Sequence, residues 1–241
     1  MKELSKSIVR RMAEPNFGRR WFVGDGLDIG GKPDPLSLYL PFFPGLKGVR
    51  VWDWEDGDAQ YLEGVAPESL DFIHSSHCLE HLVDPRQGLK AWFEAIRPGG
   101  FLVVTVPDED LYEQGVFPST HNRDHKWTFT MLKARSWSDR SINVLELLSE
   151  LGPAADVEKV ALLNSTFRYD LPRFDQTLTP IGECGIEFVV RKRSAAELEA
   201  GGLVREAVQP PPALRRHFNQ YRADHAHMKT SAPPFEDESP L

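Results

Sequence analysis

The sequence predicts an α/β domain with a mostly parallel sheet. Residues 69–76 (SLDFIHSS) and 101–107 (FLVVTVP) are apolar enough to be strands that are buried on both faces. The segment between them, residues 84–100, has the pattern of a helix, with Asp84 as its N-cap and Gly99 just past its end. Because strand, helix and strand follow in that order, a right-handed crossover and parallel strands are expected.

The last two predicted strands have no helix between them. They should therefore pair antiparallel at one edge of the sheet. Ser194 and Glu197 form a capping-box pattern, which indicates a further helix. The other expected elements are, in chain order, a helix at 2–13, strands at 27–30 and 49–53, a helix at 141–152, and strands at 157–169 and 185–193.

Composition excludes several classes of protein. The 241 residues carry a net charge of −8, which argues against a sequence-independent nucleic-acid binder. The longest apolar stretches fall far short of the ~20 residues that a membrane span needs. Two cysteines, Cys78 and Cys184, are too few for a disulfide framework, and residues 1–15 contain no apolar core of a signal peptide. A cytoplasmic protein without a membrane span is expected.

Residues 69–108 contain a run of motifs in a fixed order. Leu79-Glu80-His81 follows a strand and a short polar turn, and Arg97-Pro98-Gly99-Gly100 follows the helix and precedes the next strand. This order closely resembles class I S-adenosylmethionine-dependent methyltransferases, over about residues 23–193. The resemblance implies a Rossmann-like fold with an antiparallel edge strand and helices on both faces. Residues 1–22 and 194–230 are then expected as helical extensions, and 231–241 as a disordered tail.

The resemblance also implies where S-adenosylmethionine binds. Asp28 and Gly30 match the family's D-x-G start, although Lys32 and Asp34 stand where later glycines often occur. An acid at the end of the second strand should meet the ribose hydroxyls. The helix before the third strand is missing here. The division of roles between Asp53 and Asp58, one for the ribose hydroxyls and one for the adenine amine, is therefore open. The expected cofactor-binding residues are Asp28, Gly30, Gly31, Asp53, Asp58, Ala59, Ser75, Ser76 and His77.

The acceptor is expected to bind at residues 107–130, a long loop after a strand, rich in aromatic and polar residues. Methyl transfer to oxygen or nitrogen can need a base. His125 beside Asp124 is the first candidate and His121 the second; the alternative is that His125 only packs within the loop. A divalent metal on Asp108, Asp110, Asp124 and a histidine is a further possibility, but the spacing does not require it, and no metal ligand is assigned.

The expected function is methylation of a small-molecule or glycan-linked acceptor, with a sugar hydroxyl as the leading choice by analogy alone. One alternative is a non-catalytic cofactor-sensing or partner-binding module on the same fold. Another is a zinc hydrolase, since His77 to His81 (HCLEH) matches H-x-x-E-H. That motif needs both histidines on one helix, and the helix that begins near Asp84 leaves no room for it. Residues 167–180 could border the acceptor pocket or form a homodimer contact.

Overall fold

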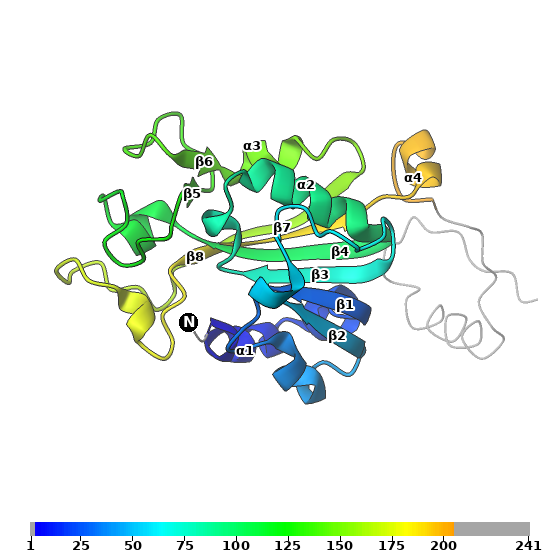
Figure 1. Ribbon diagram of the computed structural model, residues 1–241, viewed down its shortest axis with the longest axis horizontal. Coiled ribbons are helices and arrows are strands. Elements are labelled where there is room, and N and C mark those ends of the chain that lie inside the picture. Colours follow the sequence, from blue (N-terminus) through cyan, green and yellow to red (C-terminus); the bar gives the residue numbers. More distant parts are fainter. Residues whose placement is uncertain (1–2, 205–241) are drawn as a thin grey trace, which may run out of the picture. The chain divides into compact units, whose positions relative to one another are not determined.

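A computed structural model describes residues 3–204 of the chain. Within these residues a sheet of six strands runs in the order β2-β1-β3-β4-β8-β7, and two short strands, β5 and β6, pair separately (Figure 1). The strands are β1 (Gly24–Ile29), β2 (Leu46–Trp52), β3 (Leu70–Ser76), β4 (Ile96–Pro107), β5 (Thr128–Thr130), β6 (Ser141–Asn143), β7 (Ala155–Leu163) and β8 (Gly185–Lys192). The α-helices are α1 (Glu3–Ala13), α2 (Pro85–Ala95), α3 (Val144–Ser149) and α4 (Ala195–Ala200).

The strand directions confirm the predicted α/β fold. β2, β1, β3 and β4 pair in parallel, whereas β8 is antiparallel to β4 on one side and to β7 on the other. The antiparallel strand thus lies one position in from the edge, with β7 outermost. The carboxyl ends of β1, β2, β3 and β4 meet at one end of the sheet, where a Rossmann-like fold binds its ligands.

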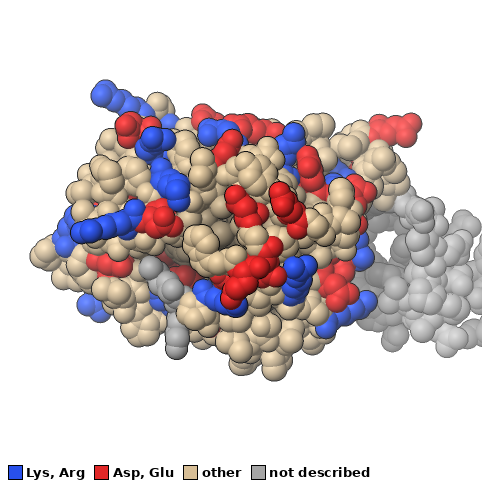
Figure 2. Space-filling model, viewed as in Figure 1, with Lys and Arg blue, Asp and Glu red and all other residues tan. Residues whose placement is uncertain are grey.

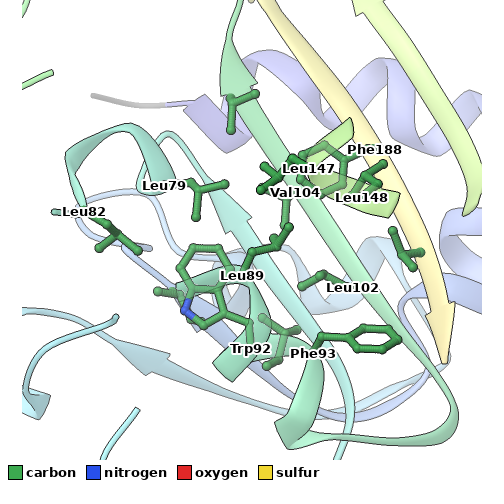
Figure 3. Packing of buried hydrophobic residues seen from close by; sticks show 14 of the residues in the cluster. Leu79, Leu82, Leu89, Trp92, Phe93, Leu102, Val104, Leu147, Leu148 and Phe188 are labelled. Atoms are coloured by element: carbon green, nitrogen blue, oxygen red, sulfur yellow. The ribbon is translucent and has the colours of Figure 1, made fainter. Parts of the chain in front are cut away.

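One face of the sheet is covered by α2 and α3. Leu89, Trp92 and Phe93 of α2 pack with Leu147 and Leu148 of α3 over the strands (Figure 3). The side chain of Asp84 caps α2 by accepting hydrogen bonds from the backbone N–H groups that follow. The helix ends at Ala95, earlier than predicted, because the twelve-residue strand β4 already begins at Ile96.

The opposite face is covered by α1, a π-helical turn at 17–21 and a 3-10 segment at 36–42, which replaces the usual first crossover helix. A buried ion-pair network crosses this face. Arg11 of α1, 1% exposed, donates to Glu187 of β8 and contacts His74 of β3. His74 in turn contacts Asp28 of β1, with 2.6 Å between Nδ1 and Oδ1. The N-terminal helix is thereby connected to the end of the first strand.

Several predicted elements have different bounds. The strand expected at 157–169 is β7, which ends at Leu163, and the strand expected at 27–30 is β1, which already begins at Gly24. The expected helix at 141–152 is divided into β6 and α3, because residues 141–143 pair with β5. Ser194 and Glu197 form the predicted capping box at the start of α4. The expected extension beyond 204 and the tail at 231–241 lie outside the described residues. Within 3–204, none of the helices has the length and hydrophobicity that a membrane span requires.

Candidate active site

A cavity of about 730 Å³ lies at the carboxyl ends of the parallel strands. This volume is within the range of small-molecule sites, roughly 300–1,000 Å³. At one end it is lined by the turn after β1 and the segment after β2, and at the other by the segment after β3 and the loop that precedes β5. The polar or glycine lining residues are Gly30, Lys32, Asp53, Gly57, Asp58, Gln60, His77, Glu80, His81, Tyr112, Asn122, Asp124, His125 and Lys126.

The end formed by Gly30 and the segment after β2, here called the donor end, is built by backbone geometry. Gly30 has φ +71°, and a Cβ there would lie 2.9 Å from Cβ of Cys78, so a larger residue would not fit. Asp28 lies behind the turn rather than in the cavity. Its Oδ2 accepts from the Leu36 N–H at 2.6 Å, while its Oδ1 contacts His74.

Asp53 closes the donor end from the side of β2. Its carboxylate accepts from the backbone N–H groups of Lys32 at 3.0 Å and Trp54 at 2.9 Å. It therefore joins the glycine turn to the segment after β2. Asp58 accepts from the Gln60 N–H at 2.8 Å, and its neighbour Ala59 also lines the cavity.

The opposite end, here called the acceptor end, surrounds Glu80, which is fully buried. One oxygen of Glu80, Oε1, lies 3.4 Å from Nδ1 of His77, 3.8 Å from Nε2 of His125 and 3.9 Å from Nε2 of His81. Neither carboxylate oxygen has a hydrogen-bond partner among residues 3–204. Burial favours the neutral acid, but the surrounding histidines outweigh it and lower the pKa of Glu80 to about 2.

The loop that carries His125 is fixed to the turn that carries Glu80. The backbone N–H of Lys126 donates to the Glu80 carbonyl at 2.9 Å, and its Nζ donates to the His81 carbonyl at 2.5 Å. Trp127 Nε1 donates to the Leu82 carbonyl at 3.1 Å. These bonds join segments 45 residues apart and hold the two sides of the acceptor end together.

The predicted base, His125, contacts Glu113 on the side away from the cavity, with 2.7 Å between Nδ1 and Oε1. The ring of Tyr112 packs against His125, with 5.0 Å between centroids. His121 contacts the ring of Tyr112 edge-on, with 5.8 Å between centroids, and does not line the cavity. Buried polar atoms without a hydrogen-bond partner in the described chain therefore gather here: both Glu80 oxygens, the Tyr112 hydroxyl, Glu113 Oε2 and His121 Nε2.

Comparison with known proteins assigns the family. The sequence profile of a family described as "Methyltransferase domain" matches residues 8–149, more than half of the chain. The chain is a class I S-adenosylmethionine-dependent methyltransferase. It is accordingly an enzyme whose cofactor is S-adenosylmethionine. Among curated proteins, no sequence matches it.

A solved structure at a TM-score of 0.50 agrees on the fold of the methyltransferase. A structure from Bacillus halodurans, provisionally assigned as a methyltransferase, superposes with a TM-score of 0.50 at 12% identity, covering 78% of this chain and 99% of that one. A S-adenosylmethionine-dependent methyltransferase from Archaeoglobus fulgidus has a TM-score of 0.49 at 17% identity, covering 80% of this chain and 95% of that one. At these identities the likeness concerns the fold alone.

The donor end of the methyltransferase fits its cofactor. Gly30 lines the cavity, and Asp53 stands at the end of β2 with lone pairs beyond its two hydrogen bonds. Four carboxylates line the cavity (Asp53, Asp58, Glu80 and Asp124) against two lysines, which favours a cationic sulfonium. Figure 2 shows acidic side chains gathered near the hollowed centre of this face.

The cavity brings together seven of the twelve residues predicted for the methyltransferase site: Gly30, Asp53, Asp58, Ala59, His77, Asp124 and His125. Asp28, Gly31 and Ser76 instead line a smaller cavity of about 70 Å³ beside α1. Ser75 is buried and donates to the Ile29 carbonyl, and His121 is outside both cavities. Sequence reasoning assigned no role to Glu80, Tyr112 or Trp54. The Leu-Glu-His motif was the available signal for Glu80, but nothing local indicates that it meets His125.

Proposed function

We propose that the enzyme transfers the methyl group to a hydroxyl of a small-molecule or glycan-linked acceptor, with a sugar as the leading class. The observation that carries this proposal is the single cavity, which runs from the glycine turn to the Glu80, His81 and His125 cluster. One reactant can bind at each end. Such alignment of donor and acceptor accounts for much of the rate of an in-line displacement.

S-adenosylmethionine supplies a methyl group on a sulfonium, so oxygen–carbon bond formation and carbon–sulfur bond cleavage leave neutral S-adenosylhomocysteine and one proton from the hydroxyl. His125 is proposed to face that hydroxyl. With Nδ1–H donated to Glu113, the neutral ring leaves the lone pair of Nε2 for the proton. Asp124 contacts Nδ1 of His81 at 3.0 Å and positions that second imidazole. His121 contacts the ring of Tyr112 outside the cavity and is assigned no part in the transfer.

A polyhydroxylated acceptor is supported by the polar lining of the acceptor end. Asn122, Asp124 and Lys126 line the cavity beside the histidines and can donate to or accept from several hydroxyls. Membership of an enzyme family favours catalysis over the non-catalytic alternative. The zinc-hydrolase alternative is not supported, because residues 79–81 form only a short 3-10 turn before α2 begins at Pro85. A cytoplasmic location, a homodimer and the domain boundaries at 22/23 and 193/194 remain proposals.

The test is incubation of the full chain with methyl-deuterated S-adenosylmethionine and a pool of sugar nucleotides, glycosides, phenols and amines. Mass spectrometry should show a trideuteromethyl group on a sugar, and NMR should place it on oxygen. A His125→Asn variant should lose most of the rate while it still binds S-adenosylhomocysteine. Transfer only to amines, or none to any acceptor, would overturn the proposed acceptor class.

A further inference from the structure

Three potential metal ligands meet in the acceptor end of the cavity. Oε1 of Glu80 lies 3.9 Å from Nε2 of His81 and 3.8 Å from Nε2 of His125. Within the described residues, this is the group whose ligand atoms all lie within 4.8 Å of one another. Two ligands bound at about 2.1 Å to one ion are at most about 4.2 Å apart. A small inward movement of the loop would therefore complete the coordination.

Both imidazoles are oriented as metal-bound histidines commonly are. Nδ1 of His125 lies 2.7 Å from a carboxylate oxygen of Glu113, and Nδ1 of His81 lies 3.0 Å from a carboxylate oxygen of Asp124. An ionised carboxylate only accepts, so each Nδ1 carries the hydrogen. In the neutral form of each ring, which is the form that binds a metal, the lone pair is then on Nε2, the atom that faces Glu80. Carboxylates that hold the outer nitrogen in this way are typical of metal sites.

Glu80 provides the independent observation. Its side chain is 0% exposed, and neither oxygen has a hydrogen bond of normal geometry in the part of the chain that the structure describes. Among these residues the nearest cationic group is His77, whose Nδ1 lies 3.4 Å from Oε1 and leaves Oε2 without a hydrogen-bond partner. The lone pairs of two imidazole nitrogens and a carboxylate oxygen therefore converge on one point. A buried charge is costly unless it is paired or coordinates a cation. A cation at this point would satisfy all three atoms at once.

We propose that Glu80, His81 and His125 bind a divalent transition-metal ion that presents open coordination positions to the acceptor. Imidazole ligands favour Zn²⁺, Fe²⁺, Ni²⁺ or Cu²⁺ over Mg²⁺ or Ca²⁺, which prefer oxygen ligands. Three protein ligands with an open position are the arrangement of catalytic rather than structural zinc sites. The ligand set differs from the His77 and His81 pair of the H-x-x-E-H pattern, because His125 comes from a distant loop.

This proposal deepens the proposed function and rests on it for the identity of the acceptor. A hydroxyl coordinated at the open position would lose its proton more readily, since a metal ion lowers the pKa of the oxygen that it binds. The proton would pass to water at the cavity mouth, and the oxygen would attack the methyl carbon as before. His125 would then act as a ligand and not as the free base.

The experiment is a calorimetric titration of the metal-stripped full chain, without an affinity tag, with Zn²⁺ alone, followed by Co²⁺ absorption spectroscopy. One site is expected, with Co²⁺ bands typical of nitrogen and oxygen ligands. His81→Ala, His125→Ala and Glu80→Gln should each weaken Zn²⁺ binding at least ~100-fold, since even outer-shell changes cost 10- to 100-fold. His121→Asn is the matched control, because it removes an imidazole from the same loop outside the ligand set. It should leave Zn²⁺ affinity unchanged.

The histidines at 217, 225 and 227 can also bind Zn²⁺, so the titrations are repeated in a background in which these three are replaced by asparagine. Equal loss of Zn²⁺ affinity in His121→Asn, or no loss in the three ligand variants, would overturn the proposal. Thermal unfolding and S-adenosylhomocysteine binding of each variant show whether it is folded. Binding of S-adenosylhomocysteine with no Zn²⁺ site would overturn the metal proposal alone. A Zn²⁺ site in a protein that methylates no hydroxyl would support the metal site and overturn the proposed acceptor.

Discussion

The two ends of the cavity differ in how their polar groups are satisfied. At the donor end, Asp53 and, behind the glycine turn, Asp28 accept hydrogen bonds from the protein's own backbone. At the acceptor end, Glu80 and the Tyr112 hydroxyl are buried without a partner among residues 3–204. A buried unsatisfied polar group costs about 1–3 kcal/mol. Folding therefore completes the donor end, whereas the acceptor end is completed only by what binds there.

If the donor end is a finished part of the fold, disrupting its support should greatly destabilise the protein. Glu187 forms an ion pair with Arg11. Arg11 contacts His74, which in turn contacts Asp28. Glu187→Gln should lower the free energy of unfolding by about 3–5 kcal/mol at pH 7, because it leaves a buried arginine without its partner. Urea unfolding measures this. Glu150→Gln, which breaks an ion pair that is 48% exposed on both sides, should cost less than about 1 kcal/mol.

The same effect should depend on pH. Burial alone would raise the pKa of Glu187. The charges of Arg11, Arg10 and Lys159 outweigh burial and lower this pKa below the ordinary 4.5. A lowered folded-state pKa gives stability that is present above pH 4.5 and is lost as the pH falls. The difference between wild type and Glu187→Gln should therefore shrink between pH 5 and pH 3. A constant difference over this range would contradict the ion-pair explanation.

An acid near the acceptor end should show the opposite dependence. Asp108 follows β4, and burial raises its pKa from 3.8 to about 6. Its ionisation then costs stability, a penalty that is absent below pH 3.8 and complete above pH 6. Asp108→Asn should raise the free energy of unfolding by up to about 3 kcal/mol at pH 7.5 and by little at pH 3.5. If Asp108→Asn instead lowered the free energy of unfolding at pH 7.5, the charged carboxylate of Asp108 would be stabilised by its surroundings, as that of Glu187 is.

Cofactor binding sharpens the comparison at the donor end. Asp53→Ala should weaken S-adenosylhomocysteine binding by about 10- to 100-fold, since a hydrogen bond to a charged group contributes about 1.5–3 kcal/mol. Calorimetry measures the affinity. Asp53→Asn keeps an oxygen that can accept from the Lys32 or Trp54 N–H, so it should lose less. Equal affinity in wild type and Asp53→Ala would remove Asp53 from the cofactor site.

Trp54 should give the smallest effect. Its side chain lines the cavity but is 89% exposed, so Trp54→Ala should change the free energy of unfolding by less than about 0.5 kcal/mol. If the indole stacks on the cofactor's adenine, its loss should weaken S-adenosylhomocysteine binding by about fivefold, or ~1 kcal/mol. Unchanged affinity would mean that the exposed ring makes no contact with the cofactor.

The sequence predicted best what depends on neighbouring residues. The buried strands at 69–76 and 101–107 and the N-cap Asp84 are local patterns, and all were confirmed. Asp53 was correctly predicted to follow the second strand, because it comes directly after the apolar run that forms the end of β2. At the end of α2 the helix pattern and the strand pattern overlap. There the pairing of β4 with β3 and β8 determined the boundary.

The acceptor end could not be predicted in the same way. Glu80 and His125 are separated by a long irregular loop, and only tertiary contacts such as Lys126 N–H to the Glu80 carbonyl place them together. The predicted cofactor contact of Asp28 stays a prediction, and no local pattern indicates that its carboxylate also contacts His74 and accepts from the Leu36 N–H. A sequence pattern gives the residue type at a position and does not give the partner that the fold brings to it.

The place of Arg11 has a consequence for synthesis of the protein. Its partner Glu187 follows 176 residues later in the chain. At about 5–20 residues per second, the ribosome needs roughly 10–35 s to make that stretch. During this time α1 and the turn after β1 exist without the strand that holds them. The turn after β1 is thus synthesised first, and its support is complete only when β8 emerges.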